Sequence, residues 1–138
     1  MIDLQNLSYA AVQVAHNFGA VAVVGGPAFL LLLESPQFIL QRKLAWFAAG
    51  GWLLQILSGI GFGVVSYTGY GSLPDIHGMA IAALYIKVAC ALAGLATALA
   101  FLGYASDWSE QRSRRVWQLL LALGVTALTA AAILRWFS

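Results

Sequence analysis

The sequence predicts an all-α membrane protein: a bundle of four transmembrane helices that forms one domain over residues 1–138. Hydrophobic residues make up 62% of the chain and charged residues only 9%, and the mean hydropathy is +0.85. This is more apolar than an ordinary soluble domain. The apolar residues also fall into four stretches that each reach the roughly 20 residues needed to cross a bilayer. These stretches cover about residues 4–33, 44–66, 78–104 and 116–137.

The polar segments between these stretches predict the topology. The basic residues within 41–43 and within 112–115 follow the first and third stretches, and loops rich in Lys and Arg are typical of the cytoplasmic side. The connection over 66–77 has no Lys or Arg and is rich in turn-forming residues, so it is expected on the other side. Both termini are then non-cytoplasmic.

Composition also excludes several classes of protein. Cys90 is the only cysteine, which rules out an internal disulfide and paired-cysteine metal or redox motifs. The first stretch has no short basic start and is too long for a signal peptide, so we expect it to be retained. The net charge is only +2, and most of the basic residues lie in two short loops. The sequence has no nucleic-acid-binding module, so nucleic acid is not an expected partner. Hydrolytic triads, phosphate-binding loops and paired catalytic carboxylates are absent from the sequence. We expect the four apolar stretches to be embedded in a lipid bilayer.

His16 is an ionisable residue inside the first apolar stretch. Helical spacing places it on one face with Gln13 and Ala20. Burying an ionisable group in a bilayer is costly unless it is paired or used, and imidazole can ligate haem iron or exchange protons with a quinone-like ligand. The alternative is a neutral histidine that Gln13 or a neighbouring helix satisfies. We predict a haem b cofactor with His16 as axial ligand and Gln13 beside it. The first helix has Asp3, Asn6 and Ser8 as alternative N-caps.

Lys87 lies about ten residues into the third stretch, and no stretch has an acidic residue well inside it. A haem propionate, a quinone oxygen, an anionic lipid or a carboxylate of a second subunit would neutralise it, as would loss of its proton. At 1.5 Å per residue, His16 lies about 18 Å and Lys87 about 15 Å from the same membrane face. We therefore predict that His16 and Lys87 form the catalytic pair and that both contact the cofactor.

Two other features are weaker candidates. His77 stands at the very start of the third stretch, some 15 Å shallower than His16, so we expect a turn or cap residue and not a second haem ligand. The segment Gly25-Gly26-Pro27 is either a functional kink or a site of close packing. We favour packing, in which Gly26 makes room for a bulky group such as the cofactor.

Copper is the alternative metal. The soft donors that select Cu(I) are limited to Cys90, Met1 and Met79, and they form no repeated spacing.

Several short motifs resemble known membrane families. They are His16-Asn-Phe-Gly-Ala-Val-Ala-Val-Val-Gly25-Gly26, Leu57-Ser58-Gly59, Tyr70-Gly71 and Tyr85-Ile86-Lys87. In order and spacing they resemble the four-helix core shared by CopD-type copper-resistance membrane domains and HemJ-type protoporphyrinogen oxidases. The HemJ resemblance implies a haem-b-associated oxidase whose intramembrane histidine and lysine correspond to His16 and Lys87. The CopD resemblance implies copper handling across a bacterial inner membrane.

These observations lead to three expectations for function. The first is a small b-type cytochrome or haem-dependent oxidoreductase of the bacterial inner membrane that exchanges electrons with a quinone or another membrane redox partner. The second is a copper transport or resistance component. The third is a cofactor-free accessory subunit of a larger membrane complex, and a homo-oligomer is compatible with each of the three.

Overall fold

The computed structural model describes residues 3–138, which fold into four long helices. They are α1 (Leu4–Leu31), α2 (Phe38–Tyr70), α3 (Met79–Tyr104) and α4 (Glu110–Phe137), with a short 3-10 helix η1 (Ala105–Asp107) between α3 and α4. Each of the four is long and apolar enough to cross a membrane. The predicted all-α, four-helix membrane bundle is confirmed.

Two helices begin earlier than the hydropathy pattern indicated. α2 begins at Phe38 and not near residue 44, and α4 begins at Glu110 and not near residue 116. Hydropathy alone assigns the polar residues there to loops, but basic side chains at a membrane interface can continue a helix while their charged ends reach water. Ser109 caps α4 by accepting a hydrogen bond from the Arg112 backbone N–H at 3.2 Å. Among the alternative caps of α1, Asp3 is the one used: its carboxylate accepts from the Gln5 backbone N–H at 3.0 Å.

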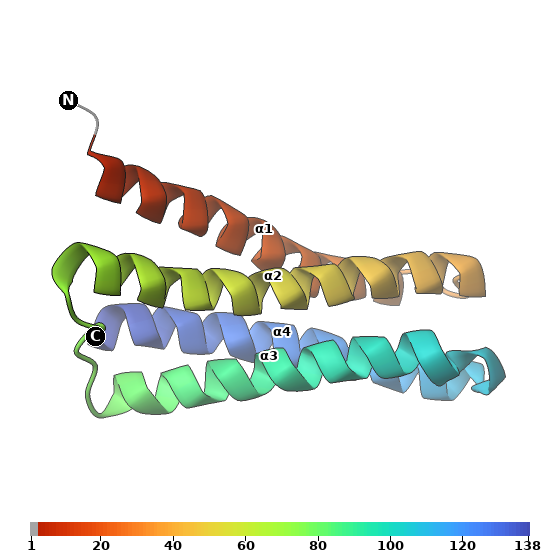
Figure 1. The fold of residues 1–138 in the computed structure, drawn as a ribbon. Coiled ribbons are helices and arrows are strands. Elements are labelled where there is room, and N and C mark those ends of the chain that lie inside the picture. Colours follow the sequence, from red (N-terminus) through yellow and green to blue (C-terminus); the bar gives the residue numbers. More distant parts are fainter. Residues whose placement is uncertain (1–2) are drawn as a thin grey trace.

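The helices run alternately in opposite directions, so the start of α1 and the end of α4 lie at one end of the bundle together with the α2–α3 connection (Figure 1). We call this the outer end, and the end that carries the other two connections the inner end. α1 packs on α2, α2 on α3, α3 on α4 and α4 on α1. The pairs α1–α3 and α2–α4 therefore lie across the two diagonals of the bundle. Which compartment each end faces stays a prediction.

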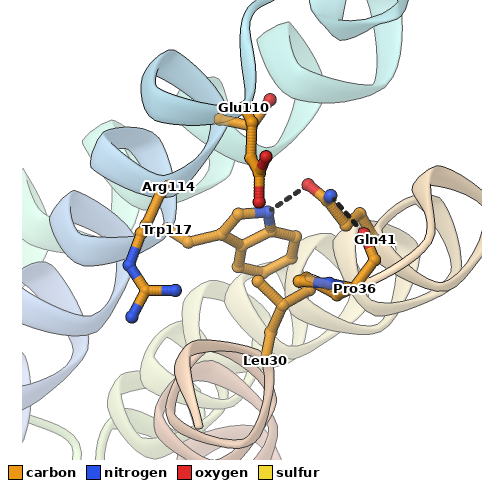
Figure 2. Close-up of a pocket in the computed structure, with 7 residues that line it drawn as sticks. Leu30, Pro36, Gln41, Glu110, Arg114 and Trp117 are labelled. Atoms are coloured by element: carbon orange, nitrogen blue, oxygen red, sulfur yellow. Dashed lines mark hydrogen bonds between the residues drawn. The ribbon is translucent and has the colours of Figure 1, made fainter. Parts of the chain in front are cut away.

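The inner half holds a packed aromatic core. Phe101 and Trp117 are fully buried with their ring centroids 5.3 Å apart, and Leu30 packs into the same cluster. Figure 2 shows how this core meets α2: the Trp117 indole N–H donates to Gln41 Oε1 at 3.3 Å, and Gln41 Nε2 donates to the Pro36 carbonyl at 2.9 Å. A cavity of about 20 Å³ beside them has room for roughly one water. A hydrogen bond between two neutral side chains therefore links α2 and α4 across this diagonal.

The outer half is more open, because α1 leaves the bundle there. None of the residues from Leu4 to Ala15 is buried, and Figure 1 shows α1 diverging from α3 and α4 towards its N-terminus. The close approach of α1 to α2 lies further in, at two glycines: a Cβ on Gly51 would stand 2.7 Å from Ala22 Cβ, and one on Gly19 would stand 3.1 Å from the Gly51 carbonyl oxygen. This crossing point lies one turn inward from His16.

Proline in α1 serves packing, as predicted for Gly25-Gly26-Pro27. Pro27 is fully buried, and α1 continues past it to Leu31. Because proline lacks an N–H, it leaves the carbonyl four residues earlier, that of Val23, without its helical donor. Gly124 of α4 approaches that carbonyl so closely that a Cβ would lie 2.9 Å from its oxygen.

Candidate functional site

His16 and Lys87 meet inside the bundle across the α1–α3 diagonal. Lys87 Nζ lies 3.0 Å from His16 Nε2, and His16 is buried while Lys87 is half-buried. Both lie well within their helices, since His16 stands about 18 Å from the start of α1 at 1.5 Å per residue. The prediction that the two residues share a depth is confirmed. The partner of Lys87 is a histidine nitrogen of the same chain.

The second nitrogen of His16 identifies which tautomer is present. His16 Nδ1 lies 2.7 Å from Ser58 Oγ, and Ser58 Oγ lies 2.6 Å from the Leu54 carbonyl oxygen. A carbonyl only accepts, so the single hydroxyl proton of Ser58 goes to Leu54, and Nδ1 must carry a proton that it donates to Ser58. Nε2 is then the acceptor, and it faces Lys87. A chain of donors runs from Lys87 through His16 and Ser58 to the backbone of α2.

Helix α2 holds His16 in place from three positions. Gln55 Nε2 donates to the His16 carbonyl oxygen at 2.5 Å, and Ser58 holds the ring nitrogen. Phe62 lies edge-on to the imidazole with ring centroids 5.6 Å apart. Gly19 makes this approach possible, because a Cβ there would stand 2.9 Å from Gln55 Nε2. The backbone and ring of His16 are both fixed before any ligand binds.

Ser58 and Gln55 were absent from the predicted site. A signal for them existed: both are polar, they lie three residues apart in an apolar stretch, and helical spacing puts them on one face. The sequence does not show that this face meets His16, because that depends on where α1 crosses α2.

Three predicted site residues lie away from the pair. Gln13 Nε2 donates to Asn17 Oδ1 at 2.7 Å within α1, so it does not hold His16. Gly26 lies ten residues along α1, roughly 15 Å from His16, where a Cβ would meet the Phe47 ring at 3.4 Å. His77 is exposed in the α2–α3 connection with Nε2 3.2 Å from Asp75 Oδ1, and its carbonyl accepts from the Ala80 N–H, which confirms a turn residue.

The predicted copper donors do not gather. Cys90 is buried beside Trp52, Met79 is 56% exposed at the start of α3, and Met1 lies outside the described residues. Within residues 3–138, no three His, Cys, Asp or Glu side chains are grouped so that they could hold a metal ion.

Trp52 is fully buried, and its indole N–H has no hydrogen-bond partner among residues 3–138.

The fit to haem can be judged from the same geometry. An axial histidine usually donates from one ring nitrogen and ligates through the other, and His16 has this arrangement with Ser58 as acceptor. However, Lys87 Nζ stands 3.0 Å from the ligating nitrogen, where the iron would approach. As arranged here, the residues do not fit a haem unless Lys87 moves away. What they do fit is a hydrogen bond in which Lys87 Nζ donates to His16 Nε2.

Comparison of the chain with protein-family models, curated proteins and solved structures finds no match. The resemblance to CopD-type and HemJ-type proteins therefore rests on the short sequence motifs and stays a prediction. The contacts among His16, Ser58 and Lys87 are therefore the observations from which a function can be inferred.

Proposed function

We propose that this chain is a membrane redox protein that acts at the quinone level and holds the head group of a quinone-like ligand at the Lys87–His16 pair. The observation that supports this is the 3.0 Å contact between Lys87 Nζ and His16 Nε2 in the membrane interior. Ionisable residues at this depth usually face a partner, a water-filled cavity or a substrate path. Here they face each other.

Lys87 has hydrogen-bonding capacity to spare. An ammonium group carries three N–H donors, and His16 accepts one of them. The rest of the described chain provides Lys87 with no other acceptor. Donors left over in an apolar setting favour a ligand that brings oxygen acceptors into the membrane. A quinone carbonyl does this, and its apolar ring and tail suit a lipid environment.

The pair also supports proton exchange with such a ligand. Reduction of a quinone to a quinol takes two electrons, which a separate membrane redox partner provides, and two protons. Lys87 delivers one proton from Nζ to a ligand oxygen, and aqueous solution provides the other. Before the ligand binds, Ser58 accepts a hydrogen bond from His16 Nδ1–H. The Nε2 lone pair therefore points towards Lys87 and accepts a hydrogen bond from Nζ.

Binding of a short-tailed quinone to the protein in lipid nanodiscs tests this proposal, with quenching of tryptophan fluorescence as the readout. We expect saturable binding that Lys87→Met weakens roughly 10- to 100-fold, the range for losing a hydrogen bond to a charged group. Lys43→Met and His77→Ala are the matched controls, because they change the other lysine and the other histidine of the chain. Quenching that does not saturate, or equal loss in the controls, would contradict the proposal.

Haem b with His16 as axial ligand is the second candidate. It requires Lys87 to move away from Nε2, and the observation in its favour is the tautomer that leaves Nε2 free of a proton. An absorption spectrum of the purified protein with and without dithionite tests it. If the bands of reduced haem b are seen, His16→Ala should abolish them and His77→Ala should leave most of them. A spectrum without visible bands removes this candidate. Metal analysis of the same sample tests the copper alternative.

A further inference from the structure

An amide pair lies on the outside of α1 at the centre of the membrane. Gln13 Nε2 donates to Asn17 Oδ1 at 2.7 Å, and Asn17 is exposed on the surface of the bundle. Since α1 runs from Leu4 to Leu31, Asn17 is about 20 Å from either end of the helix at 1.5 Å per residue. The hydrocarbon core is only about 30 Å thick. Neither end of the helix brings this amide to water.

Most of the hydrogen-bonding capacity of this pair is unused. The bond between the two side chains leaves the Asn17 Nδ2 donors and the Gln13 Oε1 acceptor without partners among residues 3–138. Lipid tails provide neither donors nor acceptors, so leaving an amide in contact with them is unfavourable. Amide side chains in transmembrane helices commonly bond across to another helix.

We propose that the Gln13–Asn17 face of α1 is the interface with a second copy of this chain. The unused donor and the unused acceptor lie on the same face, so a twofold axis lets Asn17 of each copy donate to Gln13 of the other. Any other partner helix would need its own matching donor and acceptor at this depth, whereas a second copy has both by symmetry.

The surroundings of the amides allow two helices to approach. Ala10, Gln13, Asn17 and Ala20 follow one another at three- or four-residue spacing and so share a face. Alanines on either side of the amides permit close contact between helix backbones. The outer half of α1 is also free to take a neighbour, because none of its residues before His16 is buried in the single chain. The interface does not depend on the Lys87–His16 pair, because His16 is buried inside the single chain whereas Asn17 is exposed on its surface.

Energy transfer between donor-labelled and acceptor-labelled full-length chains in phosphatidylcholine vesicles tests the interface. Across a series of protein-to-lipid ratios, we expect a monomer–dimer equilibrium that Asn17→Leu weakens on the order of tenfold. Asn17→Gln retains an amide and should restore most of the association. Thr126→Leu is the matched control, since Thr126 is an exposed polar residue at similar depth on α4, and it should leave the equilibrium unchanged.

Disulfide cross-linking provides a second measurement that needs no change to either amide. In a Cys90→Ala background, Ala10→Cys should cross-link two chains under mild oxidation, and Ile60→Cys on the exposed side of α2 should not. A chain that stays monomeric at every protein-to-lipid ratio overturns the proposal. So does unchanged association in Asn17→Leu, or cross-linking through Ile60→Cys alone.

Discussion

The two diagonals of the bundle are bridged by polar pairs of different kinds. Across α2–α4, the Trp117 indole donates to Gln41 at 3.3 Å inside a packed aromatic core. Across α1–α3, Lys87 meets His16 at 3.0 Å, and His16 is the first buried residue of α1. The first pair is neutral and the second is ionisable. The inner half therefore has the features of a structural core, and the outer half has those of a reactive site.

The two pairs differ in how many of their hydrogen-bond donors and acceptors have a partner. Gln41 uses its oxygen for Trp117 and its nitrogen for the Pro36 carbonyl, so both ends of the amide have a partner (Figure 2). Lys87 uses one donor of three. A buried polar group that is fully bonded stabilises one arrangement, whereas donors left over are available to a ligand. The following substitutions test this contrast, beginning with the largest expected effect on stability.

Trp117→Ala should be the most destabilising. It removes a fully buried indole from the inner core and leaves Gln41 Oε1 without its donor, so we expect a loss of about 3–5 kcal/mol in the free energy of unfolding. Unfolding in mixed detergent micelles, followed by circular dichroism, measures it. Trp46→Ala is the control, because Trp46 is 62% exposed on the same half of the bundle. Similar losses in the two variants would contradict the view that the inner core dominates stability.

Gly51→Ala tests the junction between the two halves. The added methyl would stand 2.7 Å from Ala22 Cβ and 3.2 Å from the Gly19 carbonyl oxygen, so α1 must shift at a cost of about 1–3 kcal/mol. His16 would move with it, so quinone binding should weaken as well. Gly50→Ala changes the adjacent residue, where nothing lies within 4 Å of the new methyl, and should be neutral or stabilising by up to about 1 kcal/mol. The same unfolding assay compares the two, and equal effects would remove the argument for a close helix crossing.

The sequence predicts the helices and the depth of their polar residues better than it predicts their neighbours. Hydropathy is sufficient for four spans, and counting residues from the membrane face is sufficient to bring His16 level with Lys87. Hydropathy places the starts of α2 and α4 too far along the chain, because polar residues at an interface resemble a loop. Residue counting measures depth along a helix and contains no information on which faces meet.

The same limit explains the remaining differences at the site. Gln13 lies within the helical face predicted around His16, yet its amide bonds along α1 to Asn17. Ser58 and Gln55 come from another helix and reach His16 only because Gly19 and Gly51 let α1 and α2 cross closely. Those contacts depend on the helix crossing, and a single sequence does not reveal it.

Ser58→Ala tests how the tautomer of His16 is fixed. Removing the hydroxyl takes away the acceptor of Nδ1–H, so the preference for this tautomer should weaken and depend on the Lys87 contact at Nε2 alone, at a cost of about 1 kcal/mol in stability. Nitrogen-15 NMR in a His77→Ala background observes His16 as the single histidine. Ser66→Ala is the control, since this buried serine of α2 donates to the Ser72 carbonyl and does not touch His16. A proton on Nε2 in the unmodified protein would show that the donor chain runs in the opposite direction.

Substitution by methionine should have opposite effects on the two diagonals: one variant should lose stability and the other should lose ligand binding. Gln41→Met leaves the buried Trp117 N–H without an acceptor and should destabilise by about 1–3 kcal/mol while quinone binding persists. Lys87→Met replaces a half-buried ionisable group by an apolar side chain of similar length. The change removes the cost of desolvating the amine and leaves His16 Nε2 without its donor, so the two effects oppose each other, while His16 keeps its bond to Ser58. It should change the free energy of unfolding little and remove most of the ligand affinity. If Lys87→Met destabilises as much as Gln41→Met and leaves binding intact, Lys87 is a folding residue and the contrast between the diagonals is wrong.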